Sequence, residues 1–161
     1  MSLAGATQAQ AEAGTDDSAL MTPLRTAQAI AALAPGGTAS ARLALTADID
    51  YYVNRSTGSD SNNGSSTSPW ASLQKAWDWT RATLDLRGHK ITIHVADHGA
   101  AHYAPLLAKG RHVGASEPAS VTFIGNTTSP DYCVVEGANN HAIYCLYGAL
   151  ARFDGIALTT T

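Results

Sequence analysis

The sequence predicts a mainly β fold with helical segments before it, and three observations support this. After Gly88, five short runs rich in β-branched or aromatic residues follow one another, each close to Gly, Asn or Asp. No helical pattern separates these runs, which is typical of a sandwich, a barrel or a solenoid. Both faces of several runs are apolar, as expected for parallel strands in covered or stacked sheets. The runs are residues 90–95, 120–125, 132–137, 141–148 and 150–159.

The composition is that of a globular chain with few charges. Of 161 residues, 45% are hydrophobic and 14% charged, which is enough apolar material for a core. The net charge of −3 gives no basic footprint, so we expect no nucleic-acid partner. No apolar run reaches the roughly 18 residues that a membrane helix needs, so we expect no membrane insertion.

The first residues lack the basic and apolar regions of a secretory signal peptide. We therefore expect synthesis in a reducing cytoplasm. The two cysteines, Cys133 and Cys145, make no disulfide framework. We expect both thiols to be free and to pack in the core as small apolar groups.

The N-terminal part predicts one short helix after a segment, residues 1–19, with too few large apolar groups to order itself. Thr22 is a good N-cap, Pro23 suits the first helical position, and residues 35–37 (Pro-Gly-Gly) end the helix. The helix is rich in alanine and only about three turns long, so it would be marginal alone in water. A second and third copy of itself are the simplest partners.

A strand, a polar loop and an amphipathic helix are predicted next. Tyr51 to Val53 read as a strand, and residues 54–68 as a loop of turn-forming residues. Ser68 can cap a helix whose first position is Pro69. We expect both tryptophans of this helix to be buried. The residues at helical spacing are Trp70, Leu73, Trp77, Thr80 and Leu84.

This middle segment resembles the entry segment of right-handed parallel β-helix proteins of the pectate-lyase-like class. The resemblance is carried by Tyr52-Val53, the loop 58–64, Pro69-Trp70 and Leu73-Gln74-Lys75-Ala76, in that order, and residues 121–137 with 142–158 resemble the first coils. It implies the start of a right-handed parallel β-helix with an N-terminal capping α-helix over residues 50–161. Since a solenoid needs about three repeats and two caps, we expect this β-helix to be truncated at its C-terminal end.

Residues 9–35, with the step Met21 to Arg25 (MTPLR), resemble a short module repeated in bacteriophage tail fibres and tailspikes. The two resemblances imply a phage or prophage tail fibre or tailspike. Residues 1–37 would be a tail-attachment and trimerisation segment, 38–49 a linker and 50–161 the β-helix. The implied protein is a structural virion component, not an enzyme within this chain. It would be a homotrimer bound to tail or baseplate proteins, with distal parts that recognise host-surface polysaccharide or a receptor.

The alternative is a polysaccharide-degrading β-helix enzyme, a lyase or glycoside hydrolase, with its catalytic part mostly outside this chain. A third reading is a bacterial surface adhesin of the same fold. Both would need an export signal, which the first residues do not show.

No catalytic, cofactor or metal residues are predicted. Asp60, Asn62 and Gly64 resemble part of a calcium loop, but a third ligand and a nearby Glu are missing, which favours a turn. His94 and His102 flank His98 at intervals of four, which suits zinc on a helix. A strand and a glycine-bounded loop are predicted there instead, so ordinary histidines are favoured.

The carboxylates of the β region are Asp97, Asp131, Glu136 and Asp154. Glu136 and Asp154 are about one coil apart and can stack as a glycosidase pair, although turn carboxylates are favoured. The tyrosines that can stack on sugars or pack as core or interface aromatics, the latter favoured, are Tyr103, Tyr132, Tyr144 and Tyr147. Lys90, Lys109 and Arg111 are basic, without a spacing that defines a cluster.

Overall fold

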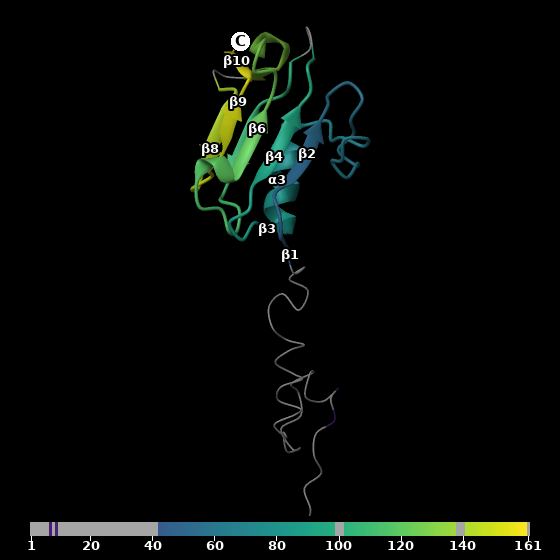
Figure 1. The fold of residues 1–161 in the computed structure, drawn as a ribbon, viewed down its shortest axis with the longest axis vertical. Helices are drawn as coiled ribbons and strands as arrows, with labels where there is room; N and C mark the ends of the chain where they lie inside the picture. The colour runs from purple at the N-terminus through teal and green to yellow at the C-terminus, as the bar shows by residue number, and fades with distance from the viewer. Residues whose placement is uncertain (1–6, 8, 10–41, 99–101, 138–140, 161) are drawn as a thin grey trace, which may run out of the picture. The chain divides into compact units, whose positions relative to one another are not determined.

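A computed structural model describes residues 7, 9, 42–98, 102–137 and 141–160 (Figure 1). The chain divides into two units, Met1–Ala41 and Arg42–Thr161, and every strand of the described residues belongs to the second. The predicted N-terminal helix and trimerisation segment lie outside the described residues.

The described part of the second unit is mainly β with one α-helix, as the sequence predicts. Two short 3-10 turns, η1 (Pro118–Ser120) and η2 (Pro130–Tyr132), precede two of the strands. The other elements are β1 (Leu43–Ala44), β2 (Ile49–Val53), α3 (Leu73–Thr83), β3 (Leu84–Asp85), β4 (Ile91–Val95), β5 (Leu106–Lys109), β6 (Val121–Ile124), β7 (Val134–Gly137), β8 (Ile143–Leu146), β9 (Arg152–Asp154) and β10 (Ala157–Thr160).

Every pairing between these strands is parallel. The largest sheet has the order β2-β4-β6-β9, and these strands lie side by side in Figure 1. Its register places Tyr51, Ile93, Phe123 and Phe153 in one row across the sheet. Three two-stranded sheets, β5-β8, β7-β10 and β1-β3, pair successive passes of the chain in the same way.

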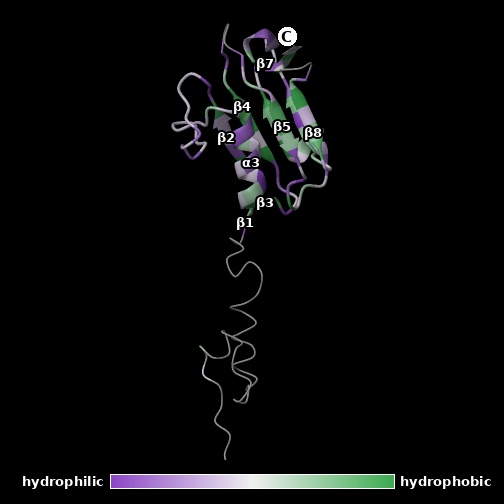
Figure 2. Cartoon of the chain, turned by 180° about the vertical axis from the view of Figure 1, so that it is seen from behind, coloured by the Kyte–Doolittle hydropathy of each residue, from purple (hydrophilic) through white to green (hydrophobic). Residues whose placement is uncertain are grey.

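Side chains alternate along each strand between the buried interior and the outer face of the sheet. In β4, Ile91, Ile93 and Val95 are buried, while Thr92 and His94 are half-buried on the opposite face. Phe123 is fully buried and its ring stacks on Phe153, with centroids 5.1 Å apart. Figure 2 shows β4 and β5 mostly hydrophobic and the loop beside β2 mostly polar.

The free edge of β2 is covered by the polar loop that follows it. Tyr52 N–H donates to the carbonyl of Gly64, and its own carbonyl accepts from Trp70 N–H. Trp70 is fully buried, stacks on Tyr51 with centroids 5.0 Å apart, and donates its indole N–H to Asn62 O at 2.8 Å. Burial of both Trp70 and Trp77 is confirmed.

The predicted start of the helix was wrong. α3 begins at Leu73 with Ser72 as its N-cap, and Trp70 forms a bridge with Val53 instead. The reason is Asp60, whose carboxylate accepts from the N–H groups of Ala71 and Ser72 and from the Ser72 hydroxyl. These bonds keep Ala71 and Ser72 outside the helix. They also satisfy N–H groups that would lack a partner in the first turn of a helix beginning at Pro69.

The helix covers the free edge of β5 through one side chain. Gln74 Oε1 accepts from Leu107 N–H at 2.9 Å, and Gln74 Nε2 donates to the Leu107 carbonyl at 3.1 Å. The side-chain amide therefore takes the place of a neighbouring strand. The edge of β3 is paired in turn by β1, which lies within the range predicted to be a linker. The second compact unit spans Arg42–Thr161 and therefore includes β1.

The parallel sheets form a stack whose first strands are β1, β2, β5 and β7 and whose last strands are β3, β8, β9 and β10. In the described part of the chain, the edge formed by β8, β9 and β10 is not covered in this way. Within residues 42–98, 102–137 and 141–160, β8, β9 and β10 each pair with one strand only, on one side. Phe153 is half-buried there, whereas its neighbour in the row, Phe123, is fully buried. Large exposed apolar side chains on or beside these strands are Leu146, Tyr147 and Leu158.

Candidate functional site

The outer face of the sheet β2-β4-β6-β9 carries a first group of candidate site residues. Its register aligns Tyr52, His94, Ile124 and Asp154 in one outward row. The Tyr52 and His94 rings stack with centroids 4.8 Å apart and planes 15° apart. They come from strands that are adjacent in space and far apart in sequence.

His94 is also held by a carboxylate. Its Nε2 lies 3.2 Å from Asp50 Oδ1. Asp50 precedes Tyr52 by two residues in β2, so both side chains lie on the same face of the sheet. Both side chains are partly exposed to solvent, so the pair is accessible. The arrangement presents a ring face, an imidazole edge and a carboxylate together.

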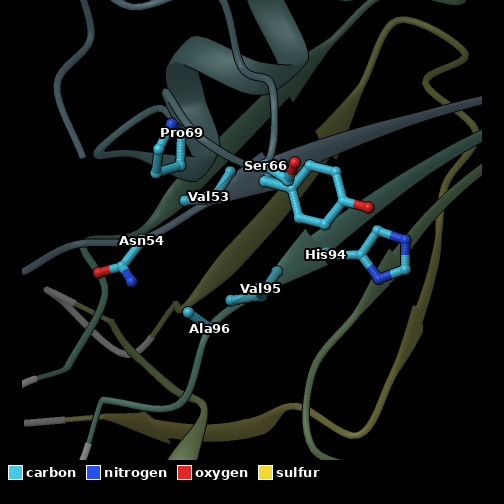
Figure 3. Close-up of a pocket in the computed structure, with 8 residues that line it drawn as sticks. Val53, Asn54, Ser66, Pro69, His94, Val95 and Ala96 are labelled. Carbon is cyan, nitrogen blue, oxygen red and sulfur yellow. The ribbon is translucent and has the colours of Figure 1, made fainter. Parts of the chain in front are cut away.

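A hollow of about 150 Å³ lies beside this pair, lined by Tyr52, Val53, Asn54, Ser66, Pro69, His94, Val95 and Ala96. Figure 3 shows that its walls come from β2, from β4 and from the loop that covers β2. The Asn54 side chain already makes two hydrogen bonds, because its Oδ1 accepts from the N–H groups of Ser56 and Thr57. The hollow suits a small group that stacks on a ring and bonds to a hydroxyl or amide.

A second hollow of about 250 Å³ is lined by Arg55, His102, Tyr103, Ala104, Pro105, Glu136 and Gly137. His102 Nδ1 lies 3.2 Å from Glu136 Oε2. Burial raises the pKa of Tyr103 to about 12, and its hydroxyl donates to the Ala96 carbonyl at 2.8 Å. Tyr103 is therefore a wall of this hollow and stays protonated, while Arg55, His102 and Glu136 supply its other polar groups.

The segment that resembles a calcium loop is a turn built from its own hydrogen bonds. Both oxygens of Asp60 accept from Ala71 and Ser72, and Asn62 Nδ2 donates to Pro69 O at 2.9 Å. Gly64 has φ +80°, and a Cβ there would lie 2.7 Å from the Trp70 ring. The polar residues thus position the chain around Trp70.

The three evenly spaced histidines have three different partners. His94 contacts Asp50, His98 Nε2 lies 3.2 Å from Ser56 Oγ, and His102 contacts Glu136. Among the described residues, no group of three or more His, Cys, Asp or Glu side chains can hold a metal ion.

The structure does not stack Glu136 on Asp154, a pairing that their spacing allowed but that was less favoured than turn carboxylates. In the register, Glu136 pairs with Thr159 and Asp154 pairs with Ile124, so the two carboxylates belong to different sheets. Asp154 instead forms an ion pair with Arg152 at 2.9 Å. Asp97 accepts from Asn126 Nδ2 and from the Cys133 thiol.

The sequence predicted core or interface packing for the tyrosines and core packing for the cysteines, and these residues differ in burial. Tyr103 and Cys133 are buried, and burial raises the pKa of the Cys133 thiol to about 11. Cys145 is exposed, so core packing was wrong for this thiol. Tyr132 and Tyr147 are exposed and Tyr144 is half-buried, so these tyrosines are not core residues, and an interface role for them stays a prediction. They lie outside the row of inward-facing residues. Both thiols are free, as expected.

The basic residues of the β region do not gather. Lys90 Nζ lies 3.5 Å from Glu117 Oε1, and Arg111 donates to the Ala115 carbonyl. Lys109 is exposed at the end of β5. No local sequence pattern marks Asp50, Tyr52 and Arg55 as site residues, although Tyr52 and Arg55 line the two hollows and Asp50 contacts His94.

Comparison with family models, with curated proteins and with solved structures gave no match. In the part of the chain that the structure describes, no helix has the length and apolar character to cross a membrane.

Proposed function

We propose that this chain is the N-terminal part of a phage or prophage tail fibre or tailspike, and that residues 42–161 begin a right-handed parallel β-helix. The observation that carries the proposal is the stacking of short parallel strands from successive passes of the chain, in register, in several sheets. Such stacking builds a shaft whose length grows with each pass. A shaft is what a fibre requires.

The covered edge supports the same proposal. A stack of parallel strands needs a cap at its first pass, since unpaired backbone groups invite other strands. Here the loop with Trp70 covers β2, and Gln74 of α3 covers β5. The proposed β-helix therefore starts here and extends away from this cap.

The N-terminal segment is proposed to attach to the tail or baseplate and to assemble three chains. This rests on its resemblance to the phage module and on a short alanine-rich helix that would be marginal alone. The β-helix is then presented to the host surface. Within the described residues, the stacked Tyr52 and His94 rings are the part of its outer face that best suits a sugar ring.

An immunoblot of purified particles with antibody raised against residues 42–161 tests the proposal. We expect the protein to co-sediment with particles through a density gradient, with a band well above the 16.7 kDa of this chain if the shaft continues. Signal confined to the culture fluid, with none in particles, would contradict a virion role. Sedimentation equilibrium of the purified chain tests the trimer.

The alternative, a polysaccharide-degrading enzyme, is favoured by one observation. The second hollow brings a His–Glu pair and Arg55 around one accessible space, and acid–base cleavage of glycans uses such groups. Release of oligosaccharides by the purified chain, lost in Glu136→Gln and retained in Asp154→Asn, would establish this alternative. No release with either protein would remove it for this chain.

A further inference from the structure

The hollow of about 150 Å³ at the first pass of the stack holds two polar groups that have no partner among the described residues. Asn54 Oδ1 accepts from the N–H groups of Ser56 and Thr57, and these two bonds fix which way the amide points. Its Nδ2 is therefore the end that can donate to a ligand. The second group is the hydroxyl of Ser66, which can both donate and accept.

Apolar surface lies directly beside these polar groups. Val53, Pro69, Val95 and Ala96 also line the hollow, and Figure 3 shows Asn54 and His94 on opposite sides of it. Its volume is below the roughly 300 to 1,000 Å³ of sites that enclose a drug-sized ligand. The hollow therefore admits one small group that is apolar at one end and makes hydrogen bonds at the other.

The charge around the hollow favours a neutral ligand. Among the described residues that line it, none is Lys or Arg. The nearby carboxylate of Asp50 lies 3.2 Å from His94 Nε2 and is exposed in part. An acidic ligand would meet this carboxylate with no basic side chain to offset it. The second hollow differs in this respect, because Arg55 lines it.

We propose that the first hollow binds the acetamido group of a neutral N-acetylated sugar. The acetamide carbonyl accepts from Asn54 Nδ2, its N–H donates to Ser66 Oγ, and its methyl group contacts Pro69. The sugar ring then packs against the stacked rings of Tyr52 and His94, which are partly exposed beside the hollow. A sugar with a hydroxyl in place of the acetamide lacks both the methyl group and the carbonyl.

This inference rests on the proposed function for the source of the sugar, which is the polysaccharide of a host surface. A contact of this size with one sugar unit is weak, with a dissociation constant of roughly a millimolar. Three chains in the proposed homotrimer would present three such sites. Their combined binding to one polysaccharide would be stronger than that of a single site, provided that the polysaccharide spans them.

Titrations of the 161-residue chain followed by NMR test the ligand class. The probes are the methyl glycosides of N-acetylglucosamine and N-acetylgalactosamine, each compared with the matching glucoside or galactoside. We expect the side-chain amide signals of Asn54 to shift, and the dissociation constant of at least one acetamido sugar to be lower than that of its matched sugar by at least about tenfold. The methyl glycoside of glucuronic acid should leave these signals unchanged.

A matched pair of variants tests the position of the site. Asn54→Asp keeps the oxygen that accepts from Ser56 and Thr57 but removes the donor, so binding of the acetamido sugar should weaken at least about tenfold. The control Asn63→Asp makes the same change in the same loop, where Asn63 Oδ1 accepts from Ser65 N–H and the side chain does not line the hollow. It should leave the affinity unchanged, and dispersed spectra show that both variants are folded.

Equal affinities for the acetamido sugars and their matched sugars would overturn the proposal. So would undiminished binding by Asn54→Asp, shifts confined to the residues around Arg55 and His102, or no binding of any probe. The outcome is separate from that of the particle immunoblot. Sugar binding by a chain that is absent from particles would remove the virion role and keep the site, whereas a chain that co-sediments with particles and binds no sugar would do the reverse.

Discussion

The first and last strand edges of the parallel stack differ in how their backbone N–H and C=O groups are covered. At the first edge, β2 is covered by the loop with Trp70 and β5 by the amide of Gln74. At the last edge, β8, β9 and β10 have no such cover among the described residues. The difference teaches that capping here is achieved by side chains and a polar loop rather than by an additional full strand.

The largest expected effect compares two phenylalanines in one row. Phe123→Ala should cost about 3 to 5 kcal/mol in the free energy of unfolding, because the ring is fully buried. Phe153→Ala at the last edge, where the ring is half-buried, should cost less than about half of that. Urea denaturation of both variants measures the difference.

Acid should destabilise the capped end. His112 is buried, its Nε2 lies 2.9 Å from Thr80 Oγ1, and its ring packs edge-on against Trp77. The Thr80 hydroxyl donates to the Ala76 carbonyl at 2.7 Å, so it accepts from His112 Nε2–H. Burial, with Arg81 nearby, lowers the pKa of His112 to about 4.

The unfolded chain therefore binds this proton at a higher pH than the folded chain does. The stabilisation is complete above about pH 6.5 and is lost as the pH falls toward 4, by about 3 kcal/mol in total. Urea midpoints between about pH 7.5 and 4.5 measure it. His112→Gln should remove this part of the pH dependence, and an unchanged slope would show that other groups cause it.

Substitutions at two glycines with positive φ distinguish the cost of a steric clash from the cost of backbone strain. Gly64→Ala forces a Cβ to within 2.7 Å of the Trp70 ring, so we expect about 1 to 3 kcal/mol beyond the strain of φ +80°. Gly148→Ala has a similar φ of +74°, and no described atom lies within 4 Å of its Cβ. It should cost only the strain, about 1 to 2 kcal/mol. Thermal unfolding of the pair should therefore rank Gly64→Ala as the more damaging.

An effect of similar size is expected at β5, where the Gln74 side chain takes the place of a neighbouring strand. Gln74→Leu removes both bonds to Leu107 and should cost about 1 to 3 kcal/mol, because a strand edge loses its partners. Gln74→Glu keeps the acceptor for Leu107 N–H and should cost less at low pH, where the carboxyl can also donate. Hydrogen exchange at the Leu107 amide reports the same bond directly. An unprotected amide in the wild type would contradict the cap.

Much of the strand pattern was predictable from the sequence. The runs that became β4, β6, β7 and β8 are rich in β-branched or aromatic residues, so local preference and tertiary pairing agree. β5 was missed because Leu-Leu-Ala-Lys favours a helix in isolation. Its pairing with β8 and the amide of Gln74 override that preference.

The candidate site was less predictable for a similar reason. Tyr52 and His94 stack only because β2 pairs with β4 in one particular register, and no local pattern determines that register. The predicted helix start failed for another reason. Trp70 matches the helical period of the buried residues that follow, although it reaches the core from an extended segment.

The parallel, in-register stack also has a mechanical consequence. Hydrogen bonds between β2, β4, β6 and β9 run across the strands, along the direction in which the stack grows. A force along that direction separates one strand pair at a time. Each hydrogen bond then resists with only about 0.5 to 1.5 kcal/mol. Resistance to tension in that direction would then come from the stacked interior rings, such as those of Phe123 and Phe153.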